Sequence, residues 1–310
     1  DFQPQPDHMS TLRLDELKRL ADLAGLQSLH LMPTFFCGHM SGVNWLPEWM
    51  LGPAAARQRF PVFANGRLQQ AAIRNFYTDE AALEAQLLQT RKVCAALASH
   101  PAVYAWDLGN EPSNCVAPPD RSMGRDWLQH ICTEIRRADP AALITLGMHA
   151  EDLEEDRCLW LQDAAQFVDF LSMHGYPFYL DWVKDSRDPD LVPFLGIITV
   201  WLGGKTVLLQ EFGATTENRA AESEDIETAS VCQLWTEDNL TEYYRKTLPV
   251  LRQNGFLGAM AWCFADYQRA LWQRPPLRDN LHERTFGLFR ADHSAKEAAE
   301  VWRNFQPVSL

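Results

Sequence analysis

Hydrophobic residues along the chain follow two alternating patterns. Segments with apolar residues every three or four positions, the spacing of one helix face, are separated by short continuous apolar runs, which are typical of buried strands. The helical pattern predicts helices over Thr11–Ala24, Thr78–Ser99, Gly124–Ala138, Leu191–Leu202, Thr236–Gln253 and Ala295–Phe305. The apolar runs predict strands over Leu26–Pro33, Ala102–Leu108, Ala142–Leu146, Phe167–Met173, Thr206–Gln210 and Phe256–Cys263. Continuous apolar strands that alternate with helices predict a parallel sheet covered on its outer faces, either open or closed into a barrel.

Polar and aromatic residues of distinctive chemistry occur where the predicted strands end. They are Asn110, Glu111, His174, Tyr176, Glu211 and Trp262. The carboxyl ends of strands are where a (β/α)₈ barrel builds its active site. A dinucleotide-binding sheet would instead carry G-x-G-x-x-G after its first strand, and none of the 16 glycines forms that motif. We therefore predict an α/β protein with a (β/α)₈ TIM barrel, forming a single catalytic domain over residues 1–310.

The number of strands raises a question about the beginning of the barrel. A closed barrel of this kind has eight strands, whereas the pattern indicates six. The sequence opens on Asp1-Phe2-Gln3, without an initiator Met or a signal peptide. We expect the first strand and most of the second to precede residue 1, together with any targeting segment, so localisation stays open. Exposed strand edges would favour dimers or aggregates, although the sequence does not decide the oligomeric state.

Composition and charge narrow the function classes. Apolar residues make up 46% and charged residues 22%, as in folded globular proteins, and no apolar run is long enough for a membrane helix. The net charge of −13 disfavours nucleic acid as a partner. The seven cysteines form no C-x-x-C pair or zinc spacing, so neither a disulfide framework nor a metal or other cofactor is expected. The 11 tryptophans hint at a carbohydrate cleft, since indole faces stack on sugar rings.

Two carboxylates at converging strand ends suit glycoside cleavage, which needs a proton donor and a nucleophile or base. Glu111 and Glu211 meet this requirement. With Asn110 before Glu111, His174-x-Tyr176 on a further strand and Trp262 on the last, the chain resembles clan A glycoside hydrolases, particularly family 5, the cellulase and β-mannanase family. The segment 38–49, GHMSGVNWLPEW, is similar to cellulase-like and β-mannosidase-like members.

The resemblance implies a retaining hydrolase of β-mannosides or β-glucosides that uses double displacement. It makes Glu111 the acid/base and Glu211 the nucleophile. Its implied supporting residues are Asn110 toward the sugar 2-hydroxyl, Tyr176 orienting Glu211, His174 beside the acid/base, His39 at the −1 sugar and Trp262 as its stacking floor, with Trp45 and Trp182 as further sugar contacts. The family's arginine on the second strand would lie ahead of residue 1, which puts the activity of this chain in doubt.

Other functions stay open at this point. A carbohydrate-binding barrel that is weak or inactive as a catalyst would share these residues. A metal hydrolase is disfavoured, because the chain has no H-E-x-x-H motif and a metal site gives Asn110 and Trp262 no task. The sequence does not decide whether the substrate is a mannoside or a glucoside. The long segments 37–67 and 213–237 favour exo action on short chains over an open groove, without deciding it.

Overall fold

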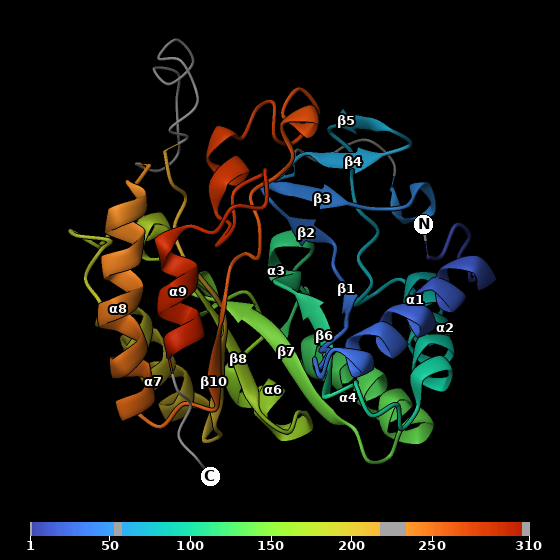
Figure 1. Cartoon of the computed structure of the whole chain (residues 1–310). Coiled ribbons are helices and arrows are strands. Elements are labelled where there is room, and N and C mark those ends of the chain that lie inside the picture. The colour runs from blue at the N-terminus through green and yellow to red at the C-terminus, as the bar shows by residue number, and fades with distance from the viewer. Residues whose placement is uncertain (1, 53–57, 218–233, 306–310) are drawn as a thin grey trace. The chain divides into compact units, whose positions relative to one another are not determined.

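The computed structural model describes residues 2–52, 58–217 and 234–305 (Figure 1). The chain forms two compact units. Unit 1 comprises Asp1–Leu171 and Leu202–Lys205, and unit 2 comprises Ser172–Trp201 and Thr206–Leu310. Both units combine strands and helices, as the α/β class requires. The single domain over residues 1–310 stays a prediction. Within the described ranges, no helix is both long and apolar enough to cross a membrane.

The parallel strands of unit 1 are β1 (Thr34–Phe36), β6 (Ala105–Asn110) and β7 (Leu143–His149), and β6 pairs with both of the others. All residues of β6 are buried except Asn110, which is partly exposed. The pairing of β6 with β7 shifts register between Asp107 and Asn110. This irregularity lies at the carboxyl end of β6, where the first candidate site residues are found.

The helices of unit 1 cover these strands. They are α1 (Thr11–Leu26), α2 (Glu80–Leu97), α4 (Arg121–Ala138) and the shorter α3 (Pro112–Cys115), α5 (Glu151–Glu154) and α6 (Leu161–Phe167). The carboxylate of Asp79 caps α2 by accepting from the backbone N–H of Ala82. Helix α2 contacts both α1 and α4 (Figure 1). Between α2 and α4, the buried indole of Trp127 donates to Gln86 Oε1 at 2.9 Å.

The structure describes a second, smaller sheet whose strands lie between His39 and Gln69, largely in the segment 37–67 for which the sequence indicated no period. It contains β2 (His39–Met40), β3 (Val43–Trp45), β4 (Val62–Ala64) and β5 (Arg67–Gln69), with the 3₁₀-helix η1 (Glu48–Met50) between β3 and β4. The β2–β3 and β4–β5 pairs are antiparallel, and β3 and β4 are parallel. Strands of two or three residues are too short to show a hydrophobic period, so the sequence could not predict this sheet.

The predicted helices are confirmed as α1, α2, α4, α7, α8 and α9, but the predicted strand Leu26–Pro33 is wrong. Helix α1 continues to Leu26, and the regular strand β1 begins only at Thr34. Upstream of β1, Leu31 pairs with Val103 as an isolated parallel bridge. Pro33 has no N–H to donate, so it interrupts the ladder between this bridge and β1.

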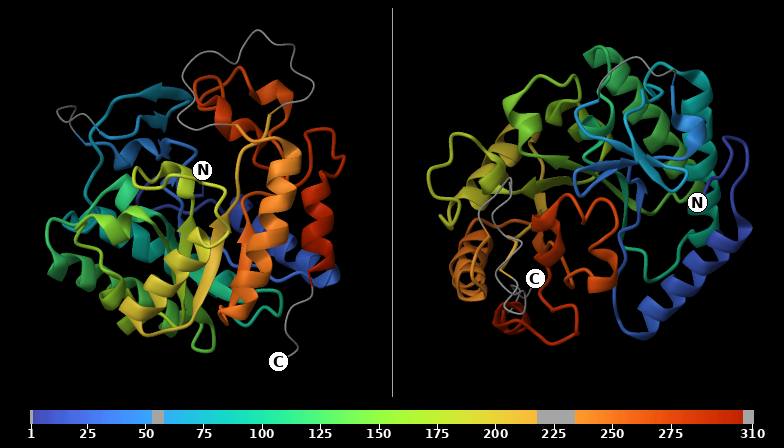
Figure 2. Two further views of the ribbon diagram at one scale, coloured as in Figure 1. Left: turned by 90° about the vertical axis from the view of Figure 1, so that its left-hand side faces the viewer. Right: turned by 90° about the horizontal axis from the view of Figure 1, so that it is seen from above.

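Unit 2 begins within β8 (Leu171–Gly175). It contains the parallel pair β9 (Val207–Phe212) and β10 (Gly258–Ala261). Its helices are α7 (Leu191–Gly203), whose last two residues belong to unit 1, α8 (Glu237–Gln253) and α9 (Glu297–Asn304), with 3₁₀-helices η2 (Pro177–Tyr179), η3 (Arg269–Leu271) and η4 (Leu281–Thr285). Helices α8 and α9 pack side by side (Figure 2). Of the long segment 213–237, residues 218–233 lie outside the described residues.

A buried ion pair ties the loops of unit 2 together. Lys296, immediately before α9, donates from Nζ to Asp266 Oδ1 at 2.8 Å, to Thr216 Oγ1 at 2.9 Å and to the Thr285 carbonyl at 3.1 Å. Its side chain is 1% exposed and that of Asp266 is 7% exposed. Burial raises the pKa of Asp266 and lowers the pKa of Lys296, so each group depends on its partner to stay charged.

Replacing Lys296 with methionine should destabilise the protein, because the substitution leaves the Asp266 carboxylate buried without its cation. We expect the free energy of unfolding to fall by about 3 kcal/mol in urea denaturation. Lys246→Met is the matched control, since Lys246 pairs with Glu242 on the surface of α8 and is 59% exposed. Its loss should be about 0.5 kcal/mol or less. Equal losses in the two variants would contradict the role given to the buried pair.

Candidate active site

The end of β6 is shaped by the buried carboxylate of Asp107. Its Oδ2 accepts from Thr34 Oγ1 of β1 at 2.8 Å, and its Oδ1 accepts from the N–H of Gly109 at 3.2 Å and of Gly147 in β7 at 3.0 Å. These bonds satisfy N–H groups at the register shift between β6 and β7. The carboxylate therefore links three adjacent strands directly before Asn110 and Glu111.

Glu111 connects β6 to the short helix α3. Its backbone is left-handed, with φ 47° and ψ 54°, and its N–H donates to the Gly147 carbonyl at 2.9 Å. Few residues other than glycine adopt this conformation, and strained backbones of this kind cluster at functional sites. One turn further along, Asn114 Nδ2 donates to Glu111 Oε2 at 2.9 Å. The side chain of Glu111 is thus held by an amide of its own helix.

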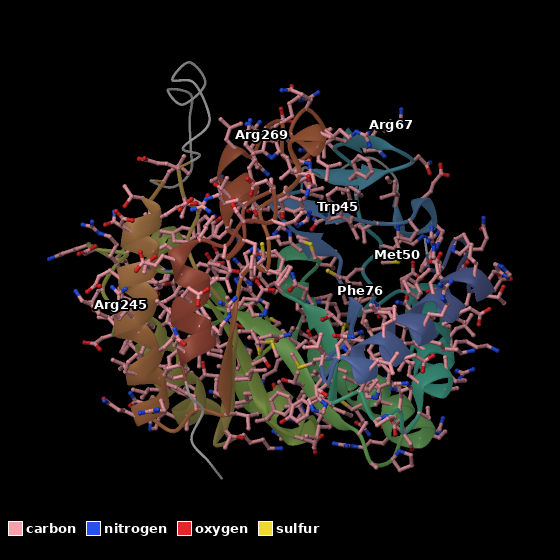
Figure 3. The ribbon with its side chains drawn as sticks, viewed as in Figure 1. Trp45, Met50, Arg67, Phe76, Arg245 and Arg269 are labelled. Atoms are coloured by element: carbon pink, nitrogen blue, oxygen red, sulfur yellow. The ribbon has the colours of Figure 1, made fainter. Side chains whose placement is uncertain are left out.

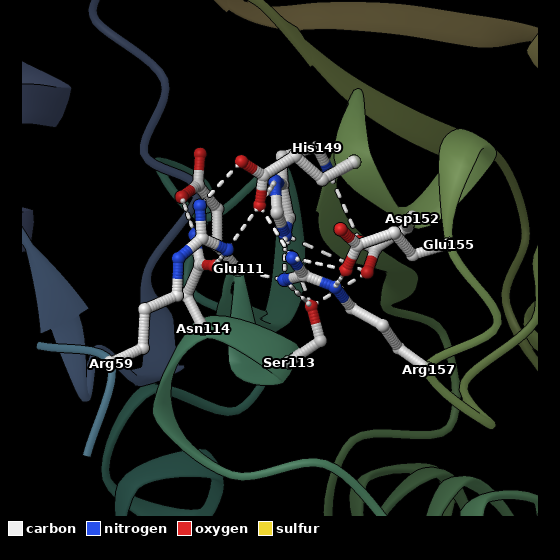
Figure 4. Close-up of polar contacts among 9 residues, drawn as sticks. Arg59, Glu111, Ser113, Asn114, His149, Asp152, Glu155 and Arg157 are labelled. Atoms are coloured by element: carbon white, nitrogen blue, oxygen red, sulfur yellow. Dashed lines mark hydrogen bonds and ion pairs between the residues drawn. The ribbon is translucent and has the colours of Figure 1, made fainter. Parts of the chain in front are cut away.

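A network of charged side chains surrounds Asn114 (Figure 4). Arg59 and Arg157 both donate from Nη1 to Asn114 Oδ1, at 3.3 and 2.9 Å. Both arginines also donate to Glu151, and the hydrogen bond from Arg59 lowers the pKa of Glu151 to about 2. The network therefore carries fixed charges across the ordinary pH range, since guanidinium groups do not deprotonate.

Next to this network, a second group of polar side chains connects α3 to α5. Ser113 Oγ donates to Asp152 Oδ1 at 2.6 Å and lies 3.0 Å from His149 Nε2. Asp152 Oδ2 accepts from the His149 N–H at 3.2 Å. The sequence did not predict these contacts, because Ser113 and the pair His149 and Asp152 come from separate segments without a shared motif.

His39 and Asn110 meet within unit 1. Asn110 Nδ2 donates to the His39 carbonyl at 2.7 Å, and the second hydrogen of that amide leaves it with further donor capacity. The His39 ring is buried, lies 3.1 Å from Asn44 Oδ1 through Nδ1, and contacts the ring of Phe60 at 4.2 Å between centroids. The small sheet thus places His39 beside the end of β6.

Trp45 lies on the same sheet. Its indole N–H donates to the Met40 carbonyl at 3.0 Å, and its ring contacts Phe63. With Met50 and Phe76 it lines an apolar cavity of about 590 Å³ within unit 1 (Figure 3).

In unit 2, two side chains face the carboxylate of Glu211 on β9. The Tyr176 hydroxyl donates to Glu211 Oε2 at 2.8 Å, and His174 Nδ1 lies 3.6 Å from the same oxygen. His174 is fully buried, and the side chain of Glu211 is 14% exposed. A hydroxyl donor favours the ionised form of the carboxylate that it bonds. Glu211 therefore has the environment that a carboxylate nucleophile needs.

Trp262 directly follows β10 and is partly buried. Its backbone N–H donates to the Phe212 carbonyl at 2.9 Å. A Cβ on Gly213 would lie 2.5 Å from the Trp262 carbonyl oxygen, so glycine permits this close approach to the end of β9. Trp182 is 49% exposed and contacts Phe194 edge-on. Its place in a sugar site stays a prediction.

The candidate residues thus fall into two groups. Unit 1 carries His39, Trp45, Asn110 and Glu111, and unit 2 carries His174, Tyr176, Trp182, Glu211 and Trp262. The separation of about 5 to 5.5 Å between the Glu111 and Glu211 carboxyl groups that a retaining mechanism requires stays a prediction, as does the position of His174 beside Glu111.

Comparisons with known proteins agree on the fold. The chain is 28% identical over 176 residues to mannan endo-1,4-beta-mannosidase A of Aspergillus aculeatus, a match that covers 51% of this chain and 44% of that protein. An exo-beta-1,4-mannosidase from Opitutaceae bacterium strain TAV5 superposes with a TM-score of 0.75 at 27% identity, over 97% of this chain and 49% of that one. A GH5_18 protein from Streptomyces cattleya in complex with Manβ1-4GlcNAc gives 0.77 at 20% identity, over 100% and 71%. No family model matches the sequence.

The prediction of an α/β fold of the (β/α)₈-barrel type is confirmed by these structures. In fold the chain is similar to solved glycoside hydrolases. Its relatives in sequence and structure include mannosidases and GH5_18 proteins, in line with the resemblance that its strand-end residues indicated. The chain spans less than half the length of the curated relative that it matches.

Replacing Tyr176 with phenylalanine should impair Glu211 without disturbing its packing, because only the hydroxyl is lost. A hydrogen bond to a charged group contributes ~1.5–3 kcal/mol, so kcat/KM for an aryl β-glycoside should fall roughly 10- to 100-fold. The ionised carboxylate also loses its donor, so the acidic limb of the pH profile should move to higher pH. Tyr179→Phe, on the neighbouring η2, is the control and should leave that limb in place. An unmoved limb in Tyr176→Phe would contradict the assigned contact.

Proposed function

We propose that this chain carries the catalytic residues of a retaining β-glycosidase that acts on β-mannosides, with Glu211 as nucleophile and Glu111 as acid/base. The observation that carries the proposal is the different hydrogen bonding of the two glutamates. Glu211 accepts from the Tyr176 hydroxyl, which suits a carboxylate that must be ionised before substrate binds. Glu111 accepts from the neutral amide of Asn114, which suits a group that must both lose and regain a proton.

The reaction proceeds in two displacements at the anomeric carbon. Glu211 attacks and forms a glycosyl ester, while Glu111 gives its proton to the departing glycosidic oxygen. Glu111, now ionised, takes a proton from water, which attacks the ester and releases a sugar of retained configuration. Asn110 has a further amide hydrogen for the sugar 2-hydroxyl, a bond that strengthens as the oxocarbenium ion forms. Trp262 supplies the stacking surface and His39 a polar contact in the same subsite.

The choice of a β-mannoside rests on the relatives. One is a mannan endo-1,4-beta-mannosidase, one is an exo-beta-1,4-mannosidase and one was solved with Manβ1-4GlcNAc. Two of the three thus cleave β-1,4-linked mannose by name, and the third holds it. The sequence alone left mannoside and glucoside open.

An assay on matched substrates tests this choice. Aryl β-mannoside should be hydrolysed with a kcat/KM at least ~10-fold above that for aryl β-glucoside, a ratio that corresponds to about 1.4 kcal/mol in the transition state. Mannan and carboxymethylcellulose are the polymer pair for the same comparison. Preference for the glucosides would overturn the assignment of a β-mannoside as the substrate. Binding of mannosides without turnover by the unmodified protein would favour an inactive carbohydrate-binding barrel.

Substitution of each glutamate should produce a distinct defect. Glu211→Ala should abolish turnover on every substrate because no ester forms, and azide should restore activity with a product of inverted configuration. Glu111→Ala should spare the first step for aryl glycosides whose leaving group needs no proton, while losing ~10²- to 10⁴-fold on oligosaccharides. Azide should then give a glycosyl azide of retained configuration. Exchange of the two behaviours would reverse the assignment, and full activity of either variant would exclude it.

A further inference from the structure

Asn114 presents its amide in one orientation. A guanidinium group can donate hydrogen bonds but cannot accept them. Arg59 and Arg157 both donate to Oδ1, so a flipped amide would point its own N–H groups at two guanidinium donors. The arginines therefore fix Oδ1 on their side and direct Nδ2 to Glu111, where it donates to Oε2 at 2.9 Å.

The two arginines are themselves held in place. Glu151, at the start of α5, accepts from Nη2 of each arginine at 2.6 Å. Arg157 is 11% exposed and also donates to Ser113 Oγ and to Glu155. The hydrogen bond to Glu151 raises the pKa of Arg59, with a smaller contribution from the charge of Glu111, so Arg59 lies within electrostatic reach of Glu111. This support comes from three segments of the chain: the one before β4, α5, and the one after α5.

The contact has a chemical consequence for Glu111. An N–H donor on Oε2 disfavours a proton on that oxygen, so the acid form carries its proton on Oε1. The same donor stabilises the ionised form that accepts a proton from water in the second displacement. A neutral amide does this without adding a charge to the site.

We propose that Asn114 is a positioning residue for the acid/base: with its amide fixed by Arg59 and Arg157, it directs the proton of Glu111 to Oε1 and lowers the pH at which Glu111 ionises. The proposal rests on the proposed role of Glu111. It assigns to the Arg59–Arg157–Glu151 network a task in the reaction beyond holding α3 and α5 together.

Asn114→Asp is the sharpest test, because aspartate keeps the shape and the acceptor for the arginines but replaces the donor with a second carboxylate oxygen. The basic limb of kcat/KM reports ionisation of the acid. We expect this limb to move up by about one pH unit, since repulsion keeps Glu111 protonated. Asn114→Ala, which only removes the donor, should move the limb in the same direction by a smaller amount. This variant replaces Asn114→Asp as the test if the aspartate variant does not fold.

The leaving group separates a positioning role from a structural one. For both variants, kcat/KM should fall roughly 10-fold on a β-1,4-mannooligosaccharide, the loss of one hydrogen bond to a charged group, and stay within about threefold on dinitrophenyl β-mannoside, whose departure needs no acid. Asn254→Asp, at the exposed end of α8, adds the same charge elsewhere and should leave both the limb and the rates unchanged.

The outcomes distinguish the proposal from the function on which it rests. If Glu111→Ala behaves as an acid/base variant while Asn114→Asp leaves the basic limb in place, the positioning role is wrong and the proposed function stands. Equal losses on both substrates with an unmoved limb would make Asn114 structural only. If Glu111→Ala keeps full activity on oligosaccharides, both proposals are overturned.

Discussion

Donors from three adjacent strands converge on the fully buried carboxylate of Asp107, and the position of Glu111 depends on them. The register shift between β6 and β7 leaves backbone N–H groups that the regular ladder does not pair, and Asp107 accepts from two of them and from Thr34 of β1. A buried carboxylate is tolerated only where such donors surround it. Because the shift is stabilised at Asp107, the chain leaves β6 with Asn110 partly exposed and Glu111 turning into α3.

The two candidate catalytic carboxylates are supported by different means. Glu211 is held by two ring-bearing side chains, Tyr176 and His174, that reach it within unit 2. Glu111 is held by the amide of Asn114, whose orientation is fixed by Arg59 and Arg157. The two guanidinium groups that orient this amide are both paired with Glu151.

The sequence predicted those site residues that directly follow strands recognisable from their apolar runs. Asn110, Glu111 and Glu211 stand where buried apolar strands end, and the pairing of the two glutamates with the Asn-Glu sequence singled them out. Arg59 and Glu151 show no such signal, since they are 92 residues apart and meet only through the tertiary fold. The same limit applies to the fold. Helices with several apolar turns were predicted within a few residues, whereas the strands of two or three residues around His39 were not, and the strand before Thr34 was misplaced because Pro33 interrupts its ladder.

The left-handed backbone of Glu111 has a consequence for how the protein divides stability and activity. A residue with a Cβ in this conformation costs roughly 1 kcal/mol or more relative to glycine. Glycine at position 111 would remove that strain together with the carboxylate, so folding alone favours a residue that cannot act as an acid. The chain with Glu111 is thus less stable than the same chain with glycine at this position would be. The lost stability lies at the residue proposed to transfer the proton.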